Sequence, residues 1–167
     1  RLDSMTGSGS DARAIGVLKA VRGFSGWDNA PAAGRARGVA FLKGFGSYIA
    51  LVAEVSQSNV GEIHVNKFSI AIDCGVVVNP GQVEFQMQGG LLHGLSAAMW
   101  HAQTFVAGKA QVANFNRYPI IKMGQMPDIA VKIVASTAAP GGVGETGVPC
   151  VAPAIANAWA KLTGTRL

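Results

Sequence analysis

The 167-residue chain is poor in cysteine, and its few cysteines and histidines do not form metal or disulfide motifs. Cys74 and Cys150 lie far apart and neither belongs to a CxxC pair, so small disulfide scaffolds, zinc fingers and cysteine-bound iron–sulfur clusters find no support. His64, His93 and His101 fit no zinc-binding spacing. We therefore expect both cysteines to be small buried residues and His93 to be structural.

Charge and long apolar runs are scarce as well. Charged residues make up 14% of the chain, against ~25% in an average globular domain, so we expect the chain to bury surface against something else. The net charge is +5, but the basic residues are scattered, which argues against a nucleic-acid partner. No run of about 18 apolar residues occurs, so we expect no transmembrane segment.

The hydrophobic periodicity predicts a mixture of helices and strands. The expected helices are residues 11–23 (capped by Ser10 or Asp11), 80–101 and 152–162, and the expected strands are residues 37–44, 47–56, 62–73 and 128–136. The second and third strands are expected to pair as an antiparallel hairpin. A smaller hairpin is expected at residues 104–112, with its turn at Gly108–Lys109. This mixture predicts an α+β fold rather than a doubly wound parallel sheet.

The two ends of the chain carry separate expectations. Residues 1–10 are polar and glycine-rich, and we expect them to be flexible or left over from cloning. Residues 11–167 are expected to form the domain itself. Because the chain opens on Arg1 and not on methionine, we expect a fragment, a processed subunit or a trimmed form of a longer protein.

One segment combines the residue types expected in a catalytic loop. The sequence PGGVGETGVP, residues 140–149, places Glu145 among four glycines and between two prolines, directly after an apolar strand. Glycines allow close backbone approach to a ligand, and prolines stiffen the loop. A carboxylate held there beside Val143 and Val148 is expected to be partly removed from water, which makes it a better proton acceptor. The alternative is a surface turn with a solvated glutamate, and composition leaves the two readings about even.

The same loop contains a pattern typical of dinucleotide-binding sites. Residues 142–147 match GxGxxG after a strand and before a helix. No acidic residue follows Glu145 to bind a ribose, and Glu145 itself would face the pyrophosphate with a negative charge. A phosphate-binding P-loop fails too, because no lysine followed by serine or threonine is present in the loop. We reject both nucleotide-binding interpretations.

Three segments, taken in order, carry a family resemblance. They are IDCG at 72–75 with VNP at 78–80, QMQGG at 86–90 with HGL at 93–95, and GVGETGVP at 142–149 followed by APAIANA at 152–158. Together they resemble the molybdopterin-binding large subunits of the xanthine dehydrogenase and aldehyde oxidase group, most closely its isoquinoline 1-oxidoreductase β-subunit branch. The resemblance runs from about Arg35 to the end and includes the helix before it.

The resemblance implies roles for individual residues. Glu145 matches the family's glutamate, which as catalytic base takes a proton from water or hydroxide on the metal. Gln86 matches a glutamine that hydrogen-bonds the cofactor, although without the resemblance it is an ordinary residue on the polar face of a helix. Gly144 would let the loop pass close to the metal, and Gly89 and Gly90 would be close-packing positions. None of these residues is expected to ligate the metal.

The resemblance also implies cofactors and partners. It predicts a molybdopterin-type molybdenum cofactor, iron–sulfur clusters on a partner subunit, and the rest of the large subunit, with an N-heterocycle or an aldehyde as substrate. Two features depart from the family: Gln88 stands where relatives often carry a glutamate, and the upstream cofactor segments, including a Gly-Gln-Gly loop, are not in this sequence. The alternative function is a non-catalytic binding or assembly domain that keeps the fold without the metal. Asp73, at a strand end, is expected to be a turn acceptor.

Overall fold

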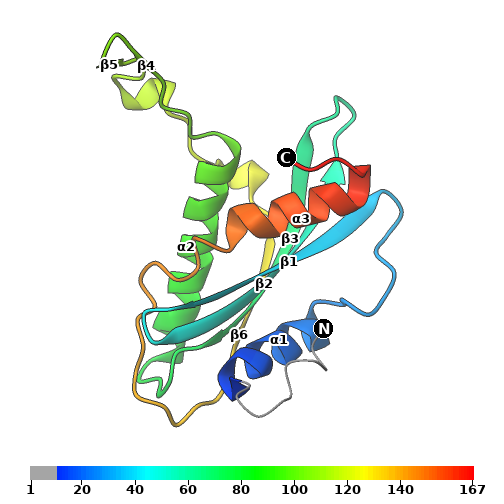
Figure 1. Cartoon of the computed structure of the whole chain (residues 1–167), viewed down its shortest axis with the longest axis vertical. Coiled ribbons are helices and arrows are strands. Elements are labelled where there is room, and N and C mark those ends of the chain that lie inside the picture. Colours follow the sequence, from blue (N-terminus) through cyan, green and yellow to red (C-terminus); the bar gives the residue numbers. More distant parts are fainter. Residues whose placement is uncertain (1–10) are drawn as a thin grey trace.

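The computed structural model describes residues 11–167, so the expectation for residues 1–10 lies outside the described residues. Its central element is a four-stranded sheet in the order β1-β2-β3-β6 (Figure 1). The strands are β1 (Arg35–Gly44), β2 (Ser47–Gln57), β3 (Ile63–Asp73) and β6 (Asp128–Ile133). The first three pair antiparallel, as expected for β2 and β3, and β6 pairs parallel to β3. The prediction of an α+β fold with mixed and antiparallel strands is confirmed, although the sequence did not indicate that β3 and β6 are the parallel pair.

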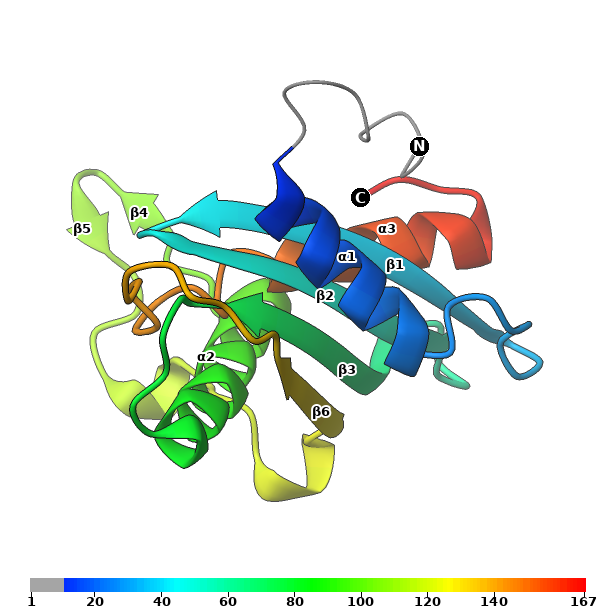
Figure 2. The ribbon, with the colours of Figure 1, turned by 90° about the horizontal axis from the view of Figure 1, so that it is seen from below.

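Helices cover both faces of this sheet. Helix α1 (Ala12–Phe24) lies on one face, and α2 (Pro80–Met99) and α3 (Val151–Thr163) lie on the other (Figure 2). Because successive side chains of a strand point to opposite faces, β2 contributes to both cores. Ile49 and Leu51 pack toward α2 and α3, whereas Ala50 and Val52 pack toward α1. None of the helices in residues 11–167 is both long and apolar enough to cross a membrane.

The apolar stripe that predicted the long helix is confirmed. Val83, Met87, Leu91 and Leu95, spaced four residues apart, are all buried on the side of α2 that faces the sheet. The helix begins where expected, because the side chain of Asn79 accepts a hydrogen bond from the backbone N–H of Gln82 at 3.2 Å, and proline occupies the first helical turn.

The predicted cap of the first helix is wrong in one respect. Asp11 does occupy the N-cap position of α1, but its carboxylate makes no capping hydrogen bond. It accepts instead from the Tyr48 hydroxyl and the Lys43 ammonium, each at 2.7 Å. These two hydrogen bonds lower the pKa of Asp11 to about 2, and the one from Lys43 has the larger effect. A charged and a phenolic donor from the sheet therefore displace the local backbone N–H as partners.

Helix α3 lies directly against the edge strand β1. A Cβ atom added at Gly38 would lie 2.2 Å from the backbone nitrogen of Ala158, so only glycine permits this approach. The Asn157 side chain donates a hydrogen bond of 3.0 Å to the Val39 carbonyl oxygen at the same crossing. The contact holds the middle of α3 against β1.

An arm of residues 101–127 leaves the end of α2; its hairpin projects away from the sheet, and its last residues return to the sheet beside α2, where the Ile121 N–H donates a hydrogen bond to Ser96 Oγ (Figure 1). It contains the two-residue strands β4 (Phe105–Val106) and β5 (Lys109–Ala110) and the short 3-10 turns η2 (Phe115–Arg117) and η3 (Met123–Gln125). The predicted hairpin is confirmed, but its turn is Ala107–Gly108 rather than Gly108–Lys109. Both turn residues have positive φ, at 48° and 74°, as two-residue hairpin turns require.

Candidate cofactor site

The structure brings two of the three predicted site residues into contact. Gln86 lies in the second turn of α2, and its amide nitrogen Nε2 donates a hydrogen bond of 2.7 Å to the carbonyl oxygen of Gly144. Gly144 lies in the glycine-rich loop between β6 and α3, 58 residues further along the chain. An amide side chain has a second donor hydrogen and an acceptor oxygen, so Gln86 keeps both available for a ligand.

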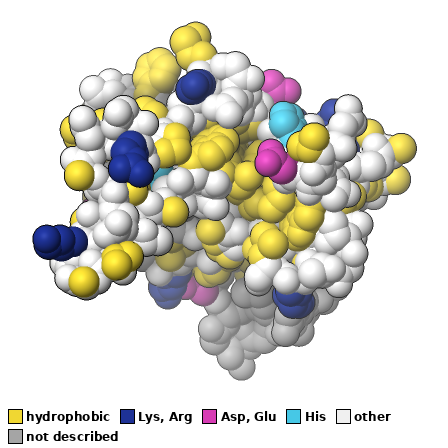
Figure 3. All heavy atoms as spheres, turned by 90° about the horizontal axis from the view of Figure 1, so that it is seen from above, with side chains coloured by type: hydrophobic (Ala, Val, Ile, Leu, Met, Phe, Trp, Pro, Cys, Tyr) yellow, Lys and Arg dark blue, Asp and Glu magenta, His cyan; other side chains and the backbone are white. Residues whose placement is uncertain are grey.

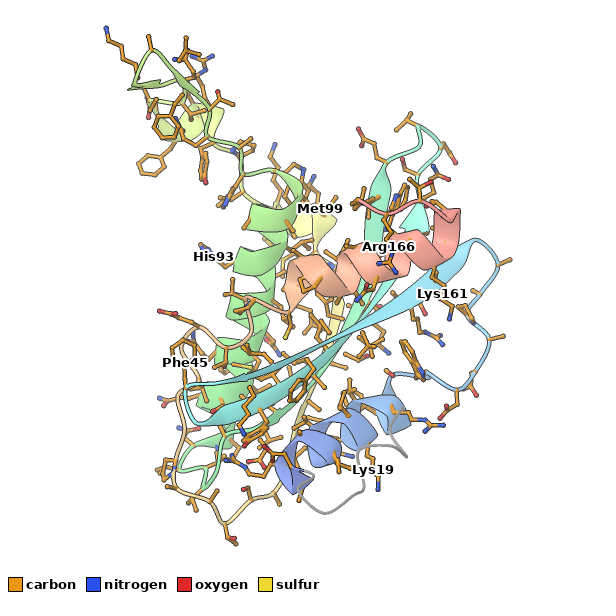
Figure 4. All side chains as sticks on the ribbon, in the orientation of Figure 1. Lys19, Phe45, His93, Met99, Lys161 and Arg166 are labelled. Atoms are coloured by element: carbon orange, nitrogen blue, oxygen red, sulfur yellow. The ribbon has the colours of Figure 1, made fainter. Side chains whose placement is uncertain are left out.

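The glycine-rich loop is also held from the side opposite Gln86. The hairpin turn between β1 and β2 makes two hydrogen bonds with Gly142. The Gly142 N–H donates to the Phe45 carbonyl oxygen, and the Gly142 carbonyl oxygen accepts from Ser47 Oγ, each at 2.7 Å. Phe45 lies at the tip of this hairpin, beside the loop that leads to α3 (Figure 4). A Cβ atom at Gly141 would come 2.5 Å from Ser47 Oγ. The loop therefore passes between two supports, each of which fixes one side of it.

The sequence did not point to Ser47 or Phe45 as part of the site. The Ser47 side chain is fully buried, and its partner is 95 residues away. Phe45 adopts a positive φ of 57°, which is uncommon for a bulky residue and places its carbonyl oxygen toward the loop. The only local signal for this turn is the pair of glycines that flank Phe45.

Glu145 follows Gly144 on the exposed side of the loop. Its carbonyl oxygen accepts a hydrogen bond of 3.0 Å from the Val148 N–H, so the backbone turns sharply after it. The adjacent Thr146 is fully buried, whereas the Glu145 side chain is exposed. The expected removal of this carboxylate from water is therefore wrong for residues 11–167, where the side chain is exposed while Val143 packs against the core. Its role as a base remains a prediction.

A groove runs beside the Gln86–Gly144 contact. It has a volume of about 640 Å³ and lies between the segment after β3, the first turns of α2 and the glycine-rich loop. Val76, Val78 and Phe85 line it and are 50%, 94% and 74% exposed. Apolar side chains of this size on the wall of an open groove are typical of a surface that something else covers.

A metal in this region would need ligands from outside the described protein residues. Residues 11–167 contain no group of three or more histidine, cysteine, aspartate or glutamate side chains able to hold a metal ion. Apart from the buried Cys74 thiol, the polar groups on the groove are backbone atoms and side-chain amides, which suit hydrogen bonding to a heteroaromatic ligand rather than metal ligation. The donor set therefore fits an organic cofactor that carries its own metal ligands.

Of the two glycines of α2 predicted to be close-packing positions, Gly90 lies against the backbone of the glycine-rich loop and Gly89 does not. Nothing in the described residues lies within 4 Å of a Cβ atom added at Gly89, so the close-packing prediction is wrong there. At Gly90 a Cβ atom would make ordinary contact with the Gly147 backbone, at 3.5 Å. The tight position is Gly94, where a Cβ atom would lie 2.8 Å from Val151 Cγ2. The glycine-rich loop rests on α2 along the face that Gly90 and Gly94 share.

Asp73 is confirmed as a turn acceptor, but it has a second and stronger partner. It accepts from the Gly75 N–H at 3.0 Å and from two nitrogens of Arg13 at 2.9 and 2.7 Å. The Arg13 guanidinium holds the pKa of this nearly buried carboxyl below its ordinary value. The pair joins α1 to the end of β3. Both cysteines are buried, as predicted.

Comparisons of the sequence and of the fold with known proteins point to the same family. The model of the molybdopterin cofactor-binding domain matches residues 16–127. Among curated proteins, subunit β of isoquinoline 1-oxidoreductase from Brevundimonas diminuta is 35% identical over 93% of this chain and 20% of its own length.

Two solved structures share the fold. Quinoline 2-oxidoreductase from Pseudomonas putida 86 has a TM-score of 0.65 at 20% identity, over 71% of this chain and 16% of that one. Aldehyde oxidoreductase from Desulfovibrio gigas has a TM-score of 0.59 at 26% identity, over 72% of this chain and 14% of that one. The chain thus spans about a fifth or less of the length of these relatives.

Proposed function

The chain belongs to the family of molybdopterin cofactor-binding domains, and we propose that residues 11–167 form the C-terminal portion of that domain in a molybdenum hydroxylase. The hydrogen bond between Gln86 and Gly144 carries the proposal, because it joins the two segments that the resemblance assigns to the cofactor. It does so next to Glu145 and beside a groove of about 640 Å³. Four supports for one loop are more than a solvated surface turn needs: Gln86, Ser47, Phe45 and the packing against α2.

We assign the recognition of the cofactor to Gln86 and Gly144. The free amide oxygen and second amide hydrogen of Gln86 would hydrogen-bond the edge of the cofactor. Gly144 has no side chain, and nothing in the described residues lies within 4 Å of a Cβ atom added there, so a ligand can reach its backbone. When bound, the cofactor supplies the oxidising centre that accepts two electrons from the substrate.

Glu145 is proposed as the general base. One of its carboxylate oxygens would accept the proton of a water molecule as the water oxygen attacks an electron-poor carbon of the substrate. Such a base must sit within about 3 Å of the proton it removes, and the stiff loop provides that fixed position. Since Glu145 is exposed in residues 11–167, the cover that excludes bulk water must come from another part of the subunit. The isolated chain is therefore expected to be inactive.

The proposed substrate is an N-heterocycle or an aldehyde. The relatives named above are an isoquinoline, a quinoline and an aldehyde oxidoreductase, and all three substrate classes offer an electron-poor carbon next to a heteroatom. The electrons would leave through iron–sulfur clusters on a partner subunit.

The exposed Glu145 favours a second candidate function. A binding or assembly domain that keeps this fold without catalysis would have no need to shield a carboxylate. Replacing Glu145 by glutamine in the complete large subunit separates the two, because glutamine preserves the shape but cannot accept the proton. We expect turnover to fall by about 10²-fold or more while molybdenum and cofactor content are retained.

The matched control is Glu84→Gln, which changes an exposed carboxylate on α2. It is expected to leave turnover unchanged. Turnover of the Glu145→Gln subunit close to that of the wild type would refute the role as base and support the non-catalytic domain.

A further inference from the structure

The arm of residues 101–127 exposes several large apolar side chains. Phe105, Phe115, Ile120 and Met123 are 69%, 91%, 65% and 89% exposed. Its hairpin consists of two strands of two residues each, far fewer than an isolated hairpin needs for stability in water. An ordered arm with this surface needs a covering partner.

A hollow at the base of the arm belongs to the same surface. It has a volume of about 630 Å³, and its apolar lining includes Met99, Trp100 and Trp159 from the ends of α2 and α3. Gly124 and Gln125, on the segment by which the arm returns to the sheet, form part of its rim. Seen from above, the molecule shows this hollow as a band of hydrophobic side chains between two higher edges (Figure 3). We name the arm and the hollow together the docking face.

The charges of the docking face select the kind of partner. The arm contains three cationic residues, Lys109, Arg117 and Lys122, and the sequence has no aspartate or glutamate from residue 85 to residue 127. A second copy of the chain placed on the arm by a two-fold axis would bring like charges together. Among the carboxylates of the described residues, those of residues 11, 28, 54 and 73 are already in ion pairs, and Glu62 lies on the hollow and not on the arm. The face suits a different polypeptide that presents carboxylates around apolar side chains.

The extent of the family match indicates which polypeptide binds the docking face. The family model covers residues 16–127 and therefore the whole arm, so the arm is a feature of the domain and not an addition to this chain. A feature that the family shares calls for a partner that the family shares. The matched part makes up 20% or less of each of these relatives, so that partner is available within their own subunits.

We propose that the docking face binds the part of the molybdopterin-binding subunit that this chain does not contain, through an apolar segment flanked by carboxylates. This inference rests on the proposed function, because it assumes that the chain works as part of such a subunit. Trp100 and Trp159 form the floor of the contact, and the arm packs against one side of the bound segment. The basic residues of the arm pair with the flanking carboxylates.

The test is the reactivity of single cysteines in the complete subunit. Both cysteines of this chain are buried, so a cysteine introduced at Phe115 has no competing thiol from this chain. The matched position is Lys19, which is also exposed and points away from the sheet on α1 (Figure 4). Maleimide is expected to modify Lys19→Cys at least about 100 times faster than Phe115→Cys. Equal rates would overturn the proposal, because they would show the arm uncovered in the assembled subunit.

Two further measurements keep the result interpretable. Hydrogen exchange of residues 102–126 in the wild-type subunit needs no substitution, and slow exchange there is expected; exchange as fast as in a free loop would contradict the proposal. Light scattering of the isolated chain tests whether a second copy of the chain binds the docking face. A dimer that the Phe115→Ser substitution dissociates would also contradict the proposal. Molybdenum content and the effect of Glu145→Gln are read separately. Failure of the proposed function would therefore show in those two readouts and not in the labelling rates.

Discussion

The Nε2 atom of Gln86 and the carbonyl oxygen of Gly144 lie 2.7 Å apart and join α2 to the glycine-rich loop. Within the described residues it is the only hydrogen bond that the loop accepts from a side chain of α2, so it decides how firmly Gly144 and Glu145 are held on that side. The neighbouring Gln82, one turn earlier on the same groove, makes no such bond with its side chain in the described residues. The two glutamines therefore form a natural pair for comparison.

Replacing Gln86 by leucine is expected to loosen the loop. The change removes one hydrogen bond and lowers the free energy of unfolding by about 1 kcal/mol. It should also speed hydrogen exchange at residues 144–148 and reduce molybdenum cofactor content in the complete subunit. Gln82→Leu, the control for the loop contact, should leave the free energy of unfolding and the exchange at residues 144–148 unchanged. Retention of cofactor with unchanged exchange in Gln86→Leu would contradict the assignment of Gln86 to the cofactor site.

Two glycines in α2 are expected to respond to alanine with opposite signs. At Gly94 a Cβ atom would meet Val151 Cγ2 at 2.8 Å and the Val148 carbonyl oxygen at 2.9 Å, so Gly94→Ala should destabilise the chain by about 1 to 3 kcal/mol. At Gly89 a Cβ atom meets nothing within 4 Å, and Gly89→Ala should stabilise the helix by up to about 1 kcal/mol. Urea unfolding of both variants measures the difference. A loss of stability in both would mean that Gly89 also lies against a neighbour.

The Arg13–Asp73 pair predicts a specific dependence of stability on pH. Arg13 lowers the pKa of Asp73, so the stability this carboxylate contributes is complete above the unfolded value of about 4 and is lost as the pH falls through the lower folded value. Asp73→Asn should cost about 2 to 3 kcal/mol at pH 7, since the carboxylate is nearly buried while Arg13 is 26% exposed. The difference from the wild type should shrink between pH 4 and pH 2.

An exposed ion pair provides the control for that measurement. Arg22 and Asp28 lie 2.9 Å apart, but both side chains are more than half exposed. Asp28→Asn is therefore expected to change the free energy of unfolding by less than about 1 kcal/mol at pH 7. A difference between Asp73→Asn and the wild type that stayed constant from pH 7 to pH 2 would show that the ionised carboxylate is not the source of the stability.

Local patterns in the sequence predicted most of the elements correctly. The four-residue spacing from Val83 to Leu95 predicted α2 and its buried face, because a helix repeats every 3.6 residues whatever it packs against. The apolar runs that became β2 and β3 and the turn signal between them predicted an antiparallel hairpin for the same reason. The mistakes were at caps and turns. The Asp11 carboxylate turned to Lys43 and Tyr48, partners more than 30 residues away that no local rule includes.

The sequence alone determined the periodic elements, the glycine-rich loop with its single carboxylate, and the order of motifs by which the family is identified, because these depend on residues close together in the chain. Only the tertiary structure decided that β6 pairs parallel with β3, that Gln86 reaches Gly144, and that Ser47 holds Gly142. It also decided that Glu145 faces outward. Each of these depends on how segments some 60 to 95 residues apart pack against one another, and a packing geometry leaves no periodic trace in the residues that produce it.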